Sequence, residues 1–82
     1  MGAPVTVRYF AGARAAAGVE TETRTATTLE ELVRQLADAH GAQLEKVLTA
    51  CSFLVDGAQA HDPAAALAPG TVVDVLPPFA GG

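Results

Sequence analysis

The sequence predicts a single α+β domain in which a mixed sheet packs against one main helix. Two observations lead to this class: strand-like alternation occurs near both ends of the chain, and a single amphipathic helical pattern lies between them. The length of 82 residues is enough for one domain and too short for two. Half of the residues are apolar and 17% are charged, a composition typical of a soluble globular protein.

The first half of this sheet is expected to be a hairpin. Segment 5–11 alternates as a half-buried strand does, with Val5, Val7 and Tyr9 on the apolar face. An alanine-rich connector at 12–18, bounded by glycines, leaves room for one short helical turn. Segment 19–25 alternates again and is rich in β-branched residues. Its charged side chains would keep an unpaired strand edge soluble, so we expect this strand at an edge of the sheet.

The main helix is predicted over residues 29–40. Thr28 is a good N-cap, Glu31 completes a capping-box pattern, and Gly41 suits the position after the last turn. The apolar positions are spaced at i, i+3, i+4 and i+7 and form one stripe: Leu29, Leu32, Val33 and Leu36. Further apolar residues at 44, 47 and 48 predict a second, shorter helical segment.

The remaining elements complete the sheet. Segment 52–55 is expected to be a strand that turns at Asp56-Gly57, a strong hairpin signal. A short helical turn is expected between Asp62-Pro63 and Pro69-Gly70. Segment 71–76 is dense in valine, as a central strand should be. This order of elements is the layout of a β-grasp, or ubiquitin-like, roll.

The end of the sequence is the strongest functional signal. Pro77 and Pro78 lack the N–H needed for a strand ladder, so they end the last strand and favour an extended chain. Six residues from 77 to 82 would reach about 20 Å, far enough to enter the active site of another protein. Gly81 and Gly82 carry no side chains that would block a narrow channel. We therefore expect a folded domain over residues 1–76 and a flexible, extended diglycine tail over residues 77–82.

These features resemble the ThiS/MoaD family of sulfur carriers, and most of all its MoaD branch, the small subunits of molybdopterin synthase. The resemblance covers nearly the whole chain. It is carried by Val7-Arg8-Tyr9-Phe10-Ala11 in the first strand, by Thr28-Leu29-Glu30-Glu31-Leu32 at the helix start, and by the tail Pro77-Pro78-Phe79-Ala80-Gly81-Gly82. The tail is the specific part, because ThiS proteins usually lack the proline pair.

The resemblance implies a carrier that is itself a substrate rather than an enzyme. An E1-like adenylyltransferase would use ATP to adenylate the carboxylate of Gly82. Sulfur transfer from a sulfur donor enzyme would then convert the acyl-adenylate to a thiocarboxylate. The tail would insert into the large subunit of molybdopterin synthase, within a heterotetramer, and give its sulfur to a pterin precursor. The chain itself would bind no cofactor and no metal.

A docking surface is expected beside the tail. If Val7 and Tyr9 face the helix, Phe10 and Leu76 lie on the uncovered face of the sheet, where exposed apolar groups suggest a partner. The tail residues Pro77, Pro78, Phe79, Ala80 and Gly81 would contact the same partner. Arg8 and Asp74 are expected to pair across adjacent strands on that face, as an exposed pair worth at most ~1 kcal/mol.

Several other functions are disfavoured by composition. The net charge is −4 and the five basic residues are scattered, which argues against nucleic acid. No stretch is long and apolar enough to span a membrane, so the cytoplasm is the expected location. Cys51 is expected to be a buried, inert thiol, and His40 and His61 are expected to be exposed or capping residues.

Three alternatives stay open on the sequence. The chain could carry sulfur for thiamin or cysteine biosynthesis. It could be a ubiquitin-like protein modifier whose terminal glycine is joined to lysines of other proteins, because both routes begin with adenylation. It could also be a simple β-grasp interaction module with an incidental Gly-Gly end.

Overall fold

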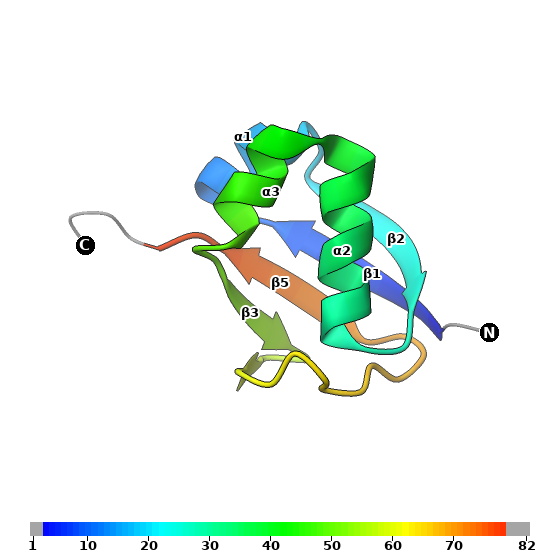
Figure 1. Cartoon of the computed structure of the whole chain (residues 1–82). Coiled ribbons are helices and arrows are strands. Elements are labelled where there is room, and N and C mark those ends of the chain that lie inside the picture. Colours follow the sequence, from blue (N-terminus) through cyan, green and yellow to red (C-terminus); the bar gives the residue numbers. More distant parts are fainter. Residues whose placement is uncertain (1–2, 79–82) are drawn as a thin grey trace.

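The computed structural model describes residues 3–78, which form a sheet covered on one face by helices (Figure 1). The elements in chain order are β1 (Ala3–Tyr9), α1 (Ala11–Ala17), β2 (Thr21–Ala26), α2 (Leu29–His40), α3 (Ala42–Leu48), β3 (Ser52–Val55), β4 (Ala58–Ala60) and β5 (Val72–Leu76). Within residues 3–78, no helix combines the length and apolar character that crossing a membrane requires.

The five strands lie in the order β2-β1-β5-β3-β4. β1 and β5 are parallel, with Val7 opposite Val73 and Tyr9 opposite Val75, whereas the other neighbouring strands are antiparallel. β5 is therefore the central strand and β2 lies at an edge, as the sequence predicts. A mixed sheet of this order with α2 across it is the β-grasp fold, so the predicted fold class is confirmed.

The predicted main helix has the observed bounds of α2. The Thr28 hydroxyl accepts a hydrogen bond from the backbone N–H of Glu31, so Thr28 is the N-cap. The Glu31 carboxylate accepts a hydrogen bond from the N–H of Thr27, one residue before the cap, at 2.6 Å. Gly41 ends α2 with φ 91°, a conformation that favours glycine, and the chain turns there into α3.

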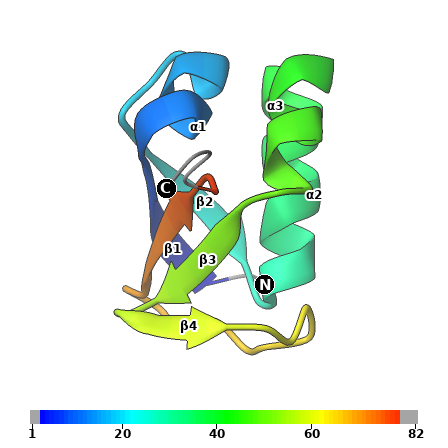
Figure 2. The same cartoon turned by 90° about the vertical axis from the view of Figure 1, so that its left-hand side faces the viewer.

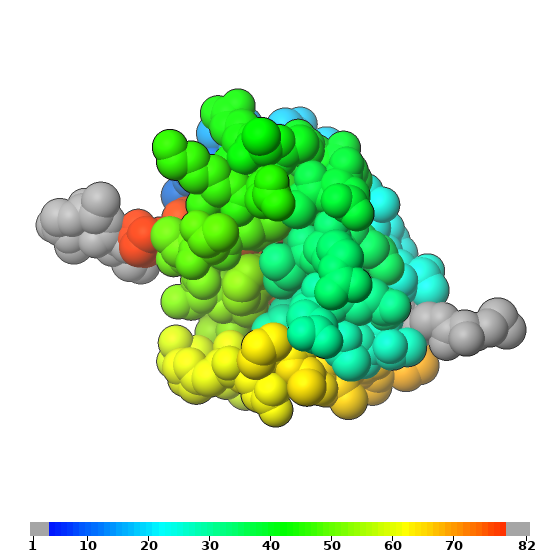
Figure 3. All heavy atoms as spheres, in the orientation of Figure 1, coloured from blue at the N-terminus to red at the C-terminus, as the bar shows by residue number. Residues whose placement is uncertain are grey.

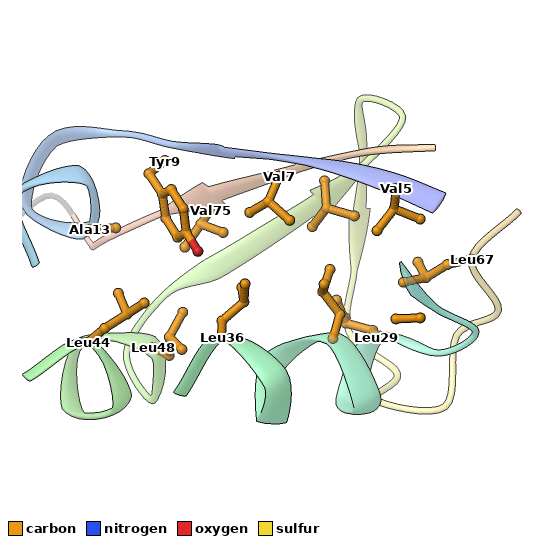
Figure 4. Close-up of a cluster of buried hydrophobic side chains, with 13 residues drawn as sticks. Val5, Val7, Tyr9, Ala13, Leu29, Leu36, Leu44, Leu48, Leu67 and Val75 are labelled. Carbon is orange, nitrogen blue, oxygen red and sulfur yellow. The ribbon is translucent and has the colours of Figure 1, made fainter. Parts of the chain in front are cut away.

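The core lies between α2, α3 and the inner face of the sheet. Figure 4 shows Val5, Val7 and Tyr9 of β1 directed toward leucines of the two helices, with Ala13 of α1 at one end. Figure 2 shows the layers from the side, with α2 and α3 packed together on one face of the sheet. The residues of the core that are fully or almost fully buried are Val5, Val7, Tyr9, Ala13, Ala26, Leu29, Leu32, Leu36, Leu44, Leu48, Leu67, Val73 and Val75.

Three details of the sequence prediction were wrong. The 12–18 connector contains more than a single turn, because α1 spans seven residues from Ala11 to Ala17 and buries Ala13 under α3. The hairpin at Asp56-Gly57 is confirmed, with both residues at positive φ, but its second strand, β4, was not predicted because its sequence Ala-Gln-Ala has no strand propensity of its own.

The third difference is the segment from Asp62 to Gly70, which forms turns and no helix. A turn begins at Asp62, whose carboxylate accepts the N–H of Ala64. The chain then runs alongside the start of α2, with hydrogen bonds from Leu29 N to Ala65 O and from Leu67 N to Thr27 O. This path buries Leu67 in the core, so tertiary packing overrides the helical preference of the alanines.

Candidate functional site

The tail leaves the sheet at its centre. β5 ends at Leu76, and neither Pro77 nor Pro78 lies in a strand or helix. Pro77 is half-buried and Pro78 is exposed, so the chain is already at the surface two residues after the strand. The other predicted tail residues, Phe79, Ala80, Gly81 and Gly82, lie outside the described residues. The role predicted for the carboxylate of Gly82 therefore stays a prediction.

Phe10 and Leu76 come together where the tail leaves the sheet. The N–H of Phe10 donates to the carbonyl of Val75 at 3.2 Å, which continues the parallel pairing and sets Phe10 beside Leu76. Phe10 is 39% exposed and Leu76 is half-buried. Their strand neighbours Tyr9 and Val75 point into the core, so both residues belong to the outer face, as predicted.

The predicted ion pair between Arg8 and Asp74 is present on the same face. The two residues are directly paired in the β1–β5 ladder, and the guanidinium is bidentate, with Nε at 2.5 Å from Oδ1 and a second nitrogen at 2.8 Å from Oδ2. The prediction of an exposed pair was wrong for the carboxylate, because the Asp74 side chain is only 10% exposed. The central position of β5 buries Asp74, and the hydrogen bonds and charge of Asp74 raise the pKa of Arg8.

These four residues form one surface, which we call the outer-face cluster: Arg8, Phe10, Asp74 and Leu76. The guanidinium carbon of Arg8 lies 5.8 Å from the centre of the Phe10 ring, within cation–π range. Arg8 thus contacts both Asp74 and Phe10. The result is a partly apolar surface next to Pro77, with the arginine and aromatic residue types that are enriched at protein interfaces.

A second polar cluster was missed by the sequence analysis. Glu22 accepts a hydrogen bond from the Tyr9 hydroxyl at 2.6 Å and pairs with Arg24 at 2.7 Å and with His40 Nε2 at 2.5 Å. The Tyr9 and His40 rings meet edge to face, with centroids 5.9 Å apart. The prediction that His40 is exposed or capping was wrong, since its side chain is 16% exposed. His40 lies four residues after Leu36 and continues the buried stripe of α2, a signal that was available in the sequence.

This cluster has a defined charge state. Burial by itself raises the pKa of the Glu22 carboxyl, but the hydrogen bonds from Tyr9, His40 and Arg24 outweigh it and hold that pKa below its ordinary value. Burial and the hydrogen bond to Glu22 raise the pKa of Tyr9 well above its usual range. An ionised Glu22 with a neutral Tyr9 is therefore the favoured pair, and it ties edge strand β2 to β1 and α2.

We expect Glu22 to make folding pH-dependent. A carboxyl whose pKa is lowered by folding stabilises the protein above its unfolded pKa, and this stability is lost as the pH falls through the folded value. Glu22→Gln should lower the free energy of unfolding by about 1–3 kcal/mol at pH 7. In urea titrations, the difference from the unmodified protein should shrink steadily below about pH 4.5. A difference that is constant down to pH 2 would contradict this role of the carboxylate.

Cys51 and His61 show no arrangement for catalysis or metal binding. Cys51 is half-buried, its thiol contacts the carbonyl of Val47 at 3.2 Å, and burial raises the pKa of the thiol. This agrees with an unreactive cysteine, although it is less buried than predicted. His61 is exposed, as expected. Across residues 3–78, no three side chains of His, Cys, Asp or Glu are grouped as metal ligands.

Comparisons with known proteins identify structures of the same fold and a protein family that matches the chain. The chain is similar over 94% of its length to a structure from Pyrococcus furiosus described as molybdopterin converting factor subunit 1, with 25% identity, 99% coverage of that chain and a TM-score of 0.79. It is also similar, over 96% of its length, to a chain in the complex of subunits 1 and 2 of molybdopterin-converting factor from Helicobacter pylori. The identity is 26%, the coverage of that chain is 99% and the TM-score is 0.74.

A third similar structure covers the whole length of this chain. The small archaeal modifier protein 1 from Methanosarcina acetivorans is 21% identical, with coverage of 100% of this chain and 99% of that chain and a TM-score of 0.88. No curated protein sequence gives a significant match. The ThiS family profile matches residues 7–82, which includes both the outer-face cluster and the predicted tail. The chain therefore belongs to the ThiS family, and its likeness within that family is to the MoaD type.

Proposed function

We propose that this chain is a sulfur carrier that acts as the small subunit of a molybdopterin synthase, with the carboxylate of Gly82 as its reactive group. The observation that carries the proposal is the position of Pro77 and Pro78. They leave the central strand next to the partly exposed outer-face cluster, so a partner that docks on that surface would also receive the end of the chain. Membership of the ThiS family and the likeness to MoaD-type structures support it.

The proposed chemistry needs activation before sulfur transfer. The Gly82 carboxylate attacks the α-phosphorus of ATP, which forms an acyl-adenylate and releases pyrophosphate. A sulfur nucleophile then attacks the acyl carbon and displaces AMP, so that one carboxylate oxygen is replaced by sulfur. A carboxylate without this leaving group does not react with a sulfur nucleophile. At the large subunit, the thiocarboxylate sulfur forms a bond to a carbon of the pterin precursor. Water then cleaves the bond between the acyl carbon and the sulfur, which restores the carboxylate and leaves the sulfur on the pterin.

In this account, the folded domain supplies position and the partners supply catalysis. The activating enzyme brings ATP, and the carrier needs no cofactor of its own. The prolines limit the directions that the chain can take after Leu76, which reduces the entropy lost when the end of the chain enters an active site. The outer-face cluster sets the distance between the docked domain and that active site.

Phe10 gives a direct test of the docking surface. Phe10→Glu should weaken binding to a molybdopterin-synthase large subunit by at least about tenfold, because it places a charge in an interface built on an aromatic anchor. Val19→Glu is the matched control: Val19 is 40% exposed and lies in the loop between α1 and β2, outside the cluster. Calorimetric titration of both variants measures the effect. Equal losses for the two variants would contradict docking through the outer-face cluster.

A second candidate is a protein modifier, which the shared fold of the small archaeal modifier protein favours. The same acyl-adenylate would then be attacked by a lysine amine of a target, and AMP would leave. Lys46 is the one lysine of this chain, so self-linked chains joined through a lysine side chain could form only there. Carriage of sulfur for thiamin or cysteine biosynthesis would use the same thiocarboxylate and a different acceptor.

One experiment separates these functions. The protein is mixed with the E1-like enzyme, ATP and a sulfur source, and then with the large subunit and pterin precursor. If the carrier loses its sulfur only when both the large subunit and the pterin precursor are present, the result supports molybdopterin synthesis. Transfer that requires a thiamin or cysteine precursor instead would assign one of those pathways, and amide-linked adducts on other proteins would assign a modifier.

A further inference from the structure

An open groove lies on the helical side of the sheet, away from the outer-face cluster. It has a volume of about 590 Å³ and runs between α2 and α3 on one side and β3, β4 and the following loop on the other. Figure 3 views this side, with the atoms of α2 next to those of β3 and of the loop that follows β4. The volume is in the range of ordinary binding clefts. The predicted chemistry of the tail makes no use of it.

The floor of the groove is apolar. Val33 and Ala37 come from α2 and Phe53 comes from β3, and all three are only partly buried although they pack against the core. Leu29 and Leu48 lie beneath them and are almost fully buried. Partly exposed apolar groups gathered in a concave surface gain free energy when a second apolar surface covers them.

The rim of the groove is acidic. Three exposed carboxylates line it: Glu30, Asp38 and Glu45. Among the described residues, the same lining contains one arginine, Arg34, and no lysine. Within residues 3–78, none of these three carboxylates forms an ion pair, whereas Glu20, Glu22 and Asp74 elsewhere each pair with an arginine. Arg34 offsets one of these three negative charges, so the rim as a whole remains acidic.

We propose that this groove binds a segment of another protein that is apolar on one side and carries lysine or arginine at its edges. The apolar side would cover Val33, Ala37 and Phe53, and the basic groups would meet the unpaired carboxylates of the rim. Charge complementarity of this kind selects the partner and speeds its association. The proposal does not depend on the function proposed for Gly82, because the groove and the outer-face cluster lie on opposite faces of the sheet.

The test uses a random peptide library displayed on phage and selected against the full-length protein. The selected peptides should combine apolar residues with lysine or arginine, and they should shift the backbone NMR signals of Val33, Ala37 and Phe53. Asp38→Lys should weaken their binding by about three- to tenfold, and high salt should do the same. Glu45→Lys, on the neighbouring helix α3, should have a similar effect.

The matched control is Glu20→Lys, which makes the same charge change on an exposed side chain outside the groove. Its effect on binding should be less than about twofold, because salt screens charges that lie far from the bound peptide. Four results would overturn the proposal. The first two are that no selected peptide binds, or that the peptides shift NMR signals of the outer face instead. The other two are that Glu20→Lys weakens binding as much as the groove variants do, or that a second copy of this chain covers the groove.

Discussion

Deleting Gly82 should reduce thiocarboxylate formation by about 100-fold or more while leaving the fold unchanged. The deletion moves the reactive carboxylate back by about 3.5 Å. A displacement of even about 1 Å can cost a factor of 100 in an enzyme active site, because the reacting atoms no longer meet. The measurement is the intact mass of the carrier after incubation with the E1-like enzyme, ATP and a sulfur source.

The deletion is informative because the folded domain does not depend on Gly82. The buried core extends from Val5 to Val75, so the variant should unfold at the same urea concentration as the full-length chain. Ala3→Ser, at the opposite end of the chain, is a control that leaves the tail complete. Unchanged thiolation of the shortened chain would mean that the terminal carboxylate at Gly82 is not the site.

The largest effect on stability is expected for Leu36→Ala. Leu36 is fully buried between α2 and the sheet, and its replacement leaves a cavity among the leucine and valine side chains of the core. The free energy of unfolding should fall by about 2–5 kcal/mol. This is a large part of the total of about 5–15 kcal/mol that is typical of a small domain.

Urea denaturation followed by circular dichroism measures this loss. Gln43→Ala, on an exposed position of α3, should change the free energy of unfolding by less than about 0.5 kcal/mol. A loss below about 1 kcal/mol for Leu36→Ala would contradict the packing of α2 on the sheet. A variant that does not fold at all would be replaced by Leu36→Val, for which a smaller loss in the same direction is expected.

Most of the fold could be predicted because local patterns and tertiary packing agree. The helical stripe that includes Leu32 and Leu36, with its cap at Thr28, has the same bounds in the structure. The alternation of β1 gave the correct buried face. β4 and the segment after it could not be predicted, because alanine-rich sequence has no preference strong enough to oppose pairing with β3 or the packing of Leu67.

The candidate site was only partly predictable. Arg8 and Asp74 were expected to pair because they share a face of adjacent strands, and the structure places them in register. The burial of Asp74 follows from the position of β5 between two strands, which depends on the whole topology. Glu22 was assigned to a solvated edge because its charge suggested exposure. Its inner-face position opposite Val7 instead brings it to Tyr9 and His40.

The most direct measurement is the intact mass of this protein purified from its native host, together with the identity of its last residue. We expect a chain that ends at Gly82, with a fraction heavier by the exchange of one oxygen for one sulfur. This fraction should disappear in a strain that lacks the E1-like enzyme. A mature chain that continues past Gly82, or one that never carries sulfur there while that enzyme is active, would contradict the account.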